Sequence, residues 1–126
     1  MTNASHSISL SVSADPRLAR LVRMTAANVA MLSSMSVDRV EDIRMAAEEA
    51  FIYACSVRPS RELPIRFDVD AQQVCMTFEL GDFDFDDAGS ASETAAYADL
   101  ILGAVCDSYE KRSAPSALSL TLKADV

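Results

Sequence analysis

Apolar positions along residues 36–56 recur at spacings of three and four, which is the pattern of one face of an α-helix. This stripe consists of Val40, Ile43, Ala47, Ala50, Phe51 and Ala54. Ser36 fits the N-cap, and Asp38 lies near the positive end of the helix dipole. A second stripe contains Asp42, Met45, Ala46, Glu49 and Tyr53. Because Glu49 and Tyr53 stand one turn apart, we expect a functional site to face this side of the helix.

The region before this helix predicts a strand followed by another helix. Residues 7–13 alternate apolar residues with serines, which is typical of a half-buried strand. Asp15 and Pro16 form a helix start, and the helix is expected to end near Ser33 or Ser34. Its apolar stripe contains Leu18, Leu21, Val22, Thr25, Val29 and Leu32. The short connection to residues 36–56 predicts that the two helices pack as antiparallel neighbours.

Three later segments show the period of two that indicates strands. The alternating residues are Ile65, Phe67 and Val69, then Val74, Met76, Phe78 and Leu80, and finally Leu118, Leu120 and Leu122. The polar residues 70–73 predict that the first two form a hairpin. Pro59 and Pro64 are expected to bracket the loop that precedes the hairpin.

Residues 81–108 lie between the hairpin and the last predicted strand. Residues 81–89 are strongly acidic and are expected to form a solvent-facing loop. Ser90 and Glu93 have capping-box spacing. A helical stripe follows, with Tyr97, Leu100, Ile101, Ala104, Val105 and Ser108. The order β-α-α-β-β-α-β predicts one two-layer α+β sandwich over residues 1–126, with the helices on one face of the sheet.

Composition narrows the possible partners. The 126 residues are 50% hydrophobic and 24% charged, which fits a single globular domain. The net charge of −8 disfavours direct binding to nucleic acid, because that affinity comes largely from Lys and Arg. It would attract a basic protein partner. The alternative is that the acidic charge only keeps a small protein in solution.

Cysteine spacing and the N-terminus indicate a cytoplasmic protein without a metal site. Cys55, Cys75 and Cys106 are too far apart in sequence to suggest a metal knuckle or a disulfide framework. No signal peptide is recognisable, and no apolar stretch is long enough to span a membrane. His6 stands in a polar leader without neighbouring ligands, so we expect no metal site there.

Four segments resemble the anti-sigma factor serine/threonine kinases, a family of the GHKL or Bergerat-fold ATPases that also include histidine-kinase catalytic domains. The segments are SVSADPRLARLVRMTAANVA, VDRVEDIRMAAEEAFIYA, FELGDFDFD and LGAVCDSYEK. The resemblance implies a mixed, largely antiparallel sheet and a homodimer. It also implies binding of ATP and Mg²⁺, inhibition of a sigma factor, and phosphorylation of an antagonist of the STAS type.

The family's nucleotide-binding motifs are altered in this chain. Its Glu-x-x-x-Asn motif supplies a general base and an asparagine that holds Mg²⁺; here Glu49 matches the base, but Tyr53 replaces the asparagine. A phenol is a poor ligand for Mg²⁺. The Asp-x-Gly motif, whose aspartate accepts from adenine, reads Glu79-Leu80-Gly81. The glycine-rich GxG lid over the phosphates is missing.

These observations lead to three hypotheses. The first is an anti-sigma-like regulator that binds a sigma factor or a STAS antagonist, with ATP binding weakened or lost and Arg20 and Arg23 contacting the partner. The second is an active serine/threonine kinase with Glu49 as its base. The third is a small-molecule sensor that uses the former nucleotide pocket. On the first hypothesis, Glu49 is simply an exposed carboxylate, and Tyr53 packs into the vestigial pocket.

Overall fold

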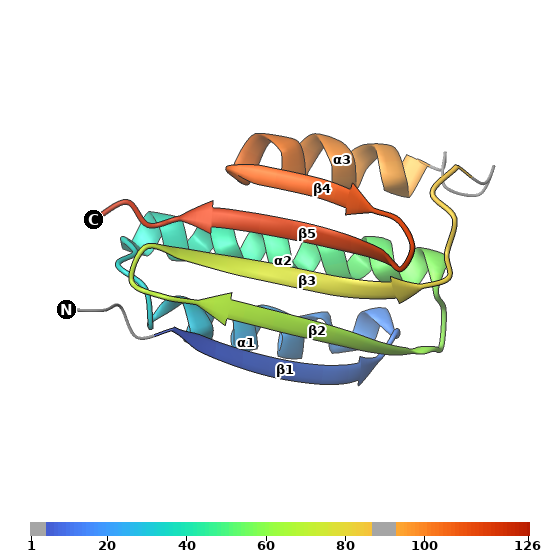
Figure 1. Cartoon of the computed structure of the whole chain (residues 1–126), viewed down its shortest axis with the longest axis horizontal. Helices are drawn as coiled ribbons and strands as arrows, with labels where there is room; N and C mark the ends of the chain where they lie inside the picture. The colour runs from blue at the N-terminus through green and yellow to red at the C-terminus, as the bar shows by residue number, and fades with distance from the viewer. Residues whose placement is uncertain (1–4, 87–92) are drawn as a thin grey trace.

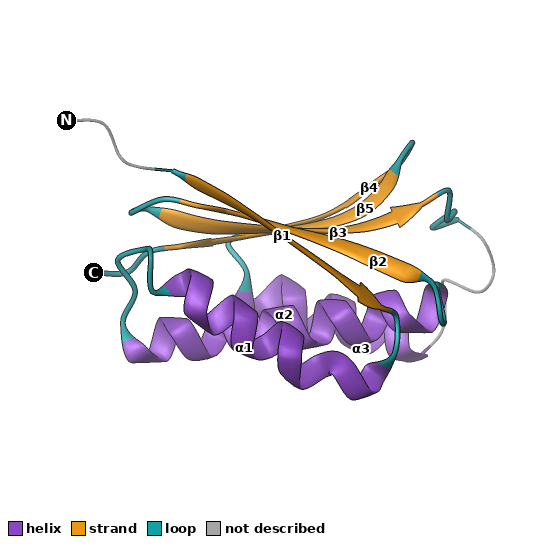
Figure 2. Cartoon of the chain, turned by 90° about the horizontal axis from the view of Figure 1, so that it is seen from below, coloured by secondary structure: helices purple, strands orange, loops and turns teal. Residues whose placement is uncertain are grey.

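A single five-stranded sheet and three α-helices form two layers in the computed structural model, which describes residues 5–86 and 93–126 (Figure 1). In chain order the elements are β1 (His6–Ser13), a 3₁₀ helix (Pro16–Leu18), α1 (Ala19–Ala30), α2 (Val37–Val57), β2 (Glu62–Val69), β3 (Gln73–Gly81), α3 (Glu93–Val105), β4 (Ser108–Arg112) and β5 (Ser116–Lys123). All three helices cover the same face of the sheet (Figure 2). The predicted two-layer α+β architecture is therefore confirmed.

The sheet has the strand order β1-β2-β3-β5-β4, and every neighbouring pair is antiparallel. The predicted hairpin of β2 and β3 is confirmed. The prediction of a mixed sheet is wrong. Short turns join β2 to β3 and β4 to β5, and strands joined by short turns run antiparallel. The loop boundary at Pro64 is also wrong, because Pro64 lies inside β2 opposite Ser11.

The prediction of four strands missed β4. We expected the last helix to extend to Ser108, but α3 ends at Val105 and Ser108 begins β4. This strand is short and lies at the sheet edge, so it lacks the run of alternating apolar residues that marks the other strands. Only Tyr109 and Lys111 pair with the inward-facing Leu120 and Leu118 of β5.

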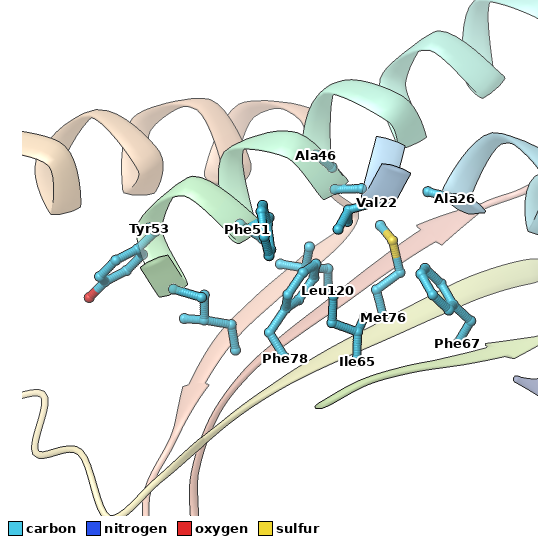
Figure 3. Packing of buried hydrophobic residues seen from close by; sticks show 14 of the residues in the cluster. Val22, Ala26, Ala46, Phe51, Tyr53, Ile65, Phe67, Met76, Phe78 and Leu120 are labelled. Carbon is cyan, nitrogen blue, oxygen red and sulfur yellow. The ribbon is translucent and has the colours of Figure 1, made fainter. Parts of the chain in front are cut away.

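The core lies between the sheet and the helices. Figure 3 shows Phe51 of α2 and Val22 of α1 above Ile65, Phe78 and Leu120 of the sheet. The helix residues nearest the sheet are mostly small, which lets the two layers approach closely. Six alanines of α1 and α2 have no exposed surface: Ala26, Ala30, Ala46, Ala47, Ala50 and Ala54.

The stripe predicted for α1 is only partly correct. Val22 and Val29 are buried, but Leu21 is 48% exposed and Leu32 is 49% exposed. The helix begins with a 3₁₀ turn capped by Asp15, and its α-helical part ends at Ala30. A 3₁₀ turn has a different number of residues per turn from an α-helix, so the buried face is rotated relative to a purely α-helical pattern.

The α2 helix has the predicted cap, and a neighbouring arginine ties its first turn to the end of the sheet. The Ser36 hydroxyl accepts from the backbone N–H of Arg39, and the Asp125 carboxylate accepts from the Ser36 N–H at 2.8 Å. Arg39 Nε donates to the Lys123 carbonyl at 2.9 Å, and its guanidinium also binds Asp107.

No described helix is both long enough and apolar enough to cross a bilayer.

Candidate functional site

The Tyr53 side of α2 faces α3 and β4, and side chains of the protein fill the space between them. Tyr53 has no exposed surface. Lys111 Nζ of β4 lies over its ring, 5.3 Å from the centroid, and is also 5.7 Å from the ring centroid of Phe85. The Tyr53 hydroxyl is buried and has no hydrogen-bond partner within residues 5–86 and 93–126. Figure 3 shows this hydroxyl directed away from the other labelled core residues.

Asp99 of α3 holds the β4 side chains in place. Its carboxylate accepts from Tyr109 Oη at 2.7 Å and from Lys111 Nζ at 2.8 Å. Burial and the hydrogen bond to Asp99 raise the pKa of Tyr109 far above its ordinary value. Burial lowers the pKa of Lys111, but the interactions with Asp99 and Tyr53 together more than offset this, and the pKa is raised overall. Lys111 is therefore a charged group held over Tyr53. We call these residues the Tyr53 cluster: Tyr53, Phe85, Asp99, Tyr109 and Lys111.

Glu49 lies one turn from Tyr53, but it faces outward. It lines a hollow of about 470 Å³ between α2 and α3, together with Glu48, Ile52, Glu93 and Tyr97. Burial, and then the neighbouring Glu48, raise the pKa of Glu49 above its ordinary value. No ion-pair partner of Glu49 occurs in the described part of the chain. Glu49 and Tyr53 thus share a side of α2 without sharing a cavity.

The other two predicted nucleotide-binding residues lie on the opposite face of the sheet. Phe78 and Leu80 of β3 point into the core, so the exposed Glu79 between them faces away from the helices. Glu79 and Gly81 line a hollow of about 420 Å³ on this open face, along with Arg58, Arg66 and Arg112. The structure therefore brings Glu79 together with Gly81, but it separates both from Glu49 and Tyr53.

Gly81 adopts a conformation that favours glycine, with φ of 65°. A Cβ atom at this position would lie 3.3 Å from Nη2 of Arg58. Arg58 also donates to Asp82 at 2.8 Å, and this bond lowers the pKa of Asp82. The glycine thus lets the Arg58 guanidinium lie close to the end of β3.

The acidic loop after β3 is only partly solvent-facing. The Asp82 side chain is 95% exposed, as predicted. However, Phe83 and Phe85 pack against the core, with ring centroids 5.2 Å apart in an edge-to-face arrangement. The predicted capping residue Ser90 lies outside the described residues. Two aromatic rings within an acidic sequence thus anchor the start of this loop.

The predicted partner-binding arginines of α1 differ in their surroundings. Arg20 is exposed and has no ion-pair partner in the described chain. Arg23 binds Glu48 of α2, and both side chains are about one-third exposed. Arg20 is therefore free to meet another protein, whereas Arg23 already links two helices.

The residues present do not fit a magnesium-bound triphosphate. Phosphoryl transfer needs the base, the metal ligand and the nucleotide held in one geometry, whereas here Glu49 and Glu79 line separate hollows and Tyr53 is buried. Within residues 5–86 and 93–126, no group of three His, Cys, Asp or Glu side chains could hold a metal ion. No known protein family matches this sequence, and no curated protein is significantly similar to it.

The sequence predictions do not include Asp99, Tyr109 and Lys111, because the last helix is expected to run to Ser108 and no strand is predicted between it and the last strand. The sequence does contain a pattern that indicates the β4 strand. Tyr109 and Lys111 are two residues apart, as required for two side chains on one face of a strand, and both follow the helix end at Val105. This pattern is hard to recognise because Lys111, a charged residue, occupies the helix-facing side of the strand, where an apolar residue is expected.

Proposed function

We propose that this protein is a regulatory domain of the anti-sigma type, with a GHKL-like fold, that acts by binding other proteins and transfers no phosphate. The Tyr53 cluster is the observation that carries this proposal. In the family that the sequence resembles, the position of Tyr53 belongs to the asparagine that holds Mg²⁺. Here it is a fully buried ring beneath Lys111. Mg²⁺ needs several compact oxygen ligands in a tight octahedron. The carboxylate of this cluster, Asp99, is already bound by Tyr109 and Lys111, and the Lys111 ammonium repels a cation.

The position of Glu79 supports the same proposal. Phosphoryl transfer depends almost entirely on holding the nucleotide, the metal and the attacking group in one geometry. Glu49 lines the α2–α3 hollow, whereas Glu79 lies on the far face of the sheet. A base and an adenine acceptor so placed could not act on one nucleotide. This argues against the active serine/threonine kinase.

The surface of the helix layer supports binding by protein contact. Several large apolar side chains are about half exposed or more, and exposed apolar groups often mark interaction sites. They are Leu21, Met24, Met45, Tyr97 and Leu100. A sigma factor and a STAS-type antagonist are the proposed partners, with Arg20 at the contact. The proposal includes a homodimer, for which β1 offers a free sheet edge.

A small-molecule sensor is the second candidate. It is favoured by the hollow of about 420 Å³ on the open face of the sheet, which falls within the usual volume range of ligand pockets. This hollow is on the side of the sheet opposite the Tyr53 cluster. A sensor built on it would differ from the one predicted from the resemblance, which reuses the nucleotide pocket.

The experiment mixes the purified protein with sigma factors and STAS proteins of its own organism. Size-exclusion chromatography with light scattering measures complex formation, and radiolabelled ATP with Mg²⁺ measures phosphate transfer. We expect a stable complex with at least one partner and no label on any STAS protein. A labelled serine or threonine would overturn the proposal. An active anti-sigma kinase with its own STAS partner, assayed in parallel, shows that transfer is detectable.

A further inference from the structure

The three helices form one layer on one face of the sheet (Figure 2). A hollow in this layer is lined by residues of α2 and α3 alone among the described residues. Arg39 near the start of α2 donates to the carbonyl of Val105 at the end of α3, at 3.4 Å. This contact shows that the two helices run antiparallel. We call the surface around this hollow the α2–α3 groove. Its hollow is lined by Glu49 and Ile52 from α2 and by Glu93 and Tyr97 from α3. We include in the groove Met45 and Leu100, which lie one helical turn from Glu49 and Tyr97 on the same faces of their helices.

Exposed apolar side chains border this groove on both helices. Met45 is 47% exposed, Tyr97 is 57% exposed and Leu100 is 70% exposed. Tyr97 and Leu100 are three residues apart on α3, and Met45 precedes Glu49 by four residues on α2, so each pair occupies one face of its helix. Ile52 lines the hollow between them. Parallel apolar borders of this kind suit the apolar stripe of a third helix.

The charges that line the hollow itself are of one sign. Glu48, Glu49 and Glu93 line the hollow, and none of its lining residues is basic. Arg23 and Arg44 line an adjoining hollow beside Met45, and they are paired with Glu48 and Glu41. The ion pair with Arg23 neutralises Glu48. Glu49 and Glu93 have no ion-pair partner in the described part of the protein. Partial burial and Glu48 already disfavour the charge on Glu49, and the attraction of a cation from a partner would offset both effects.

We propose that the α2–α3 groove binds an amphipathic helix of a partner protein, one that carries Lys or Arg beside its apolar stripe. The inference rests on the proposed function, binding by contact, and names the surface and the chemistry of the partner. The apolar stripe of the partner helix packs on Met45, Ile52 and Leu100. The basic side chains reach Glu49 and Glu93, and a guanidinium also stacks on the exposed Tyr97 ring. The overall charge of −8 steers such a helix towards the protein.

A second copy of this chain suits the groove less well. The exposed basic residue Arg20 and its neighbours Leu21 and Met24 on α1 could enter the groove of another copy. That contact would join two different surfaces, and such contacts close only when the rotation between copies forms a ring. We therefore assign the groove to a different protein and include self-association among the outcomes of the test.

The test uses a fluorescent peptide of about 18 residues, with leucines on one helical face and lysines elsewhere. A twin peptide carries glutamate in place of every lysine. Fluorescence anisotropy at physiological ionic strength measures binding to the wild-type protein. We expect saturable binding of the lysine peptide and none of the glutamate peptide. Absence of binding by the lysine peptide would overturn the proposal.

Two matched variants locate the binding. Glu49→Lys reverses a charge in the groove, whereas Glu110→Lys makes the same change on β4, where the side chain is 59% exposed. We expect Glu49→Lys to weaken binding at least about tenfold and Glu110→Lys to weaken it less than about twofold. Circular dichroism confirms that both variants fold. Equal weakening by the two would show that the peptide senses only the net charge, which would overturn the proposal.

Two further measurements separate the remaining outcomes. Leu100→Ser should weaken binding at least about fivefold, whereas Met31→Ser, at a 73% exposed apolar residue of the α1 end, should change it less than about twofold. Light scattering of the wild-type protein that showed growth with concentration, abolished by Glu49→Lys, would assign the groove to a second copy and overturn the proposal. Phosphate transfer would instead defeat the proposed function, so the two failures are distinguishable.

Discussion

Replacing Tyr53 by asparagine tests whether its ring is a packing element. The side chain has no exposed surface, and Lys111 lies over the ring at 5.3 Å. Truncating a buried aromatic residue typically costs about 3–5 kcal/mol. Loss of the cation–π contact adds about 0.5–2 kcal/mol, but asparagine fills part of the space that alanine would leave empty. We therefore expect Tyr53→Asn to lower the free energy of unfolding by about 3–5 kcal/mol.

Tyr53→Phe is the matched control, because it removes only the hydroxyl. This hydroxyl is buried without a hydrogen-bond partner in the described chain, so its loss should change the free energy of unfolding by less than about 1 kcal/mol. Urea unfolding followed by circular dichroism gives both values. The reasoning fails if Tyr53→Asn lies within about 1 kcal/mol of the wild type, or if Tyr53→Phe is as damaging as Tyr53→Asn.

Two further predictions concern α2. Arg39→Met should cost about 2–4 kcal/mol in urea unfolding, because Arg39 is 15% exposed and bonds to Asp42, Asp107 and the Lys123 carbonyl. The control Arg44→Met removes an exposed pair with Glu41 and should cost less than about 0.5 kcal/mol; similar losses would contradict the role of Arg39. The pKa of Glu49 is raised in the folded state, so ionisation of Glu49 destabilises the fold. Glu49→Gln should therefore raise the urea midpoint near neutral pH, with the gain vanishing as the pH falls below about 4, and a pH-independent gain would refute this.

The elements with a complete period of apolar residues could be predicted from sequence. The α2 helix, β1 and the β2–β3 hairpin lie where expected, because each buries one face against a layer and so needs a regular pattern. The β4 strand escaped prediction because its inward residues are a tyrosine and a lysine. The lysine pairs there with Asp99 of α3, and a local sequence pattern does not reveal that contact.

The candidate site was predictable in part. The spacing of Glu49 and Tyr53 correctly placed them on one side of α2, but it could not show that Tyr53 is buried and Glu49 faces outward. That difference depends on how α3 and β4 pack. The orientation of Glu79 was implicit in the sequence, since Phe78 and Leu80 point inward and alternate residues of a strand face opposite sides.

Calorimetric titration of the intact protein with Mg-ATP tests the Tyr53 cluster most directly. Side chains of α2, α3, β4 and the loop after β3 already interact where the resemblance places the metal and phosphates. We expect no binding heat up to millimolar nucleotide, and the thermal unfolding midpoint should not move. Saturable, magnesium-dependent binding of the nucleotide would contradict this account.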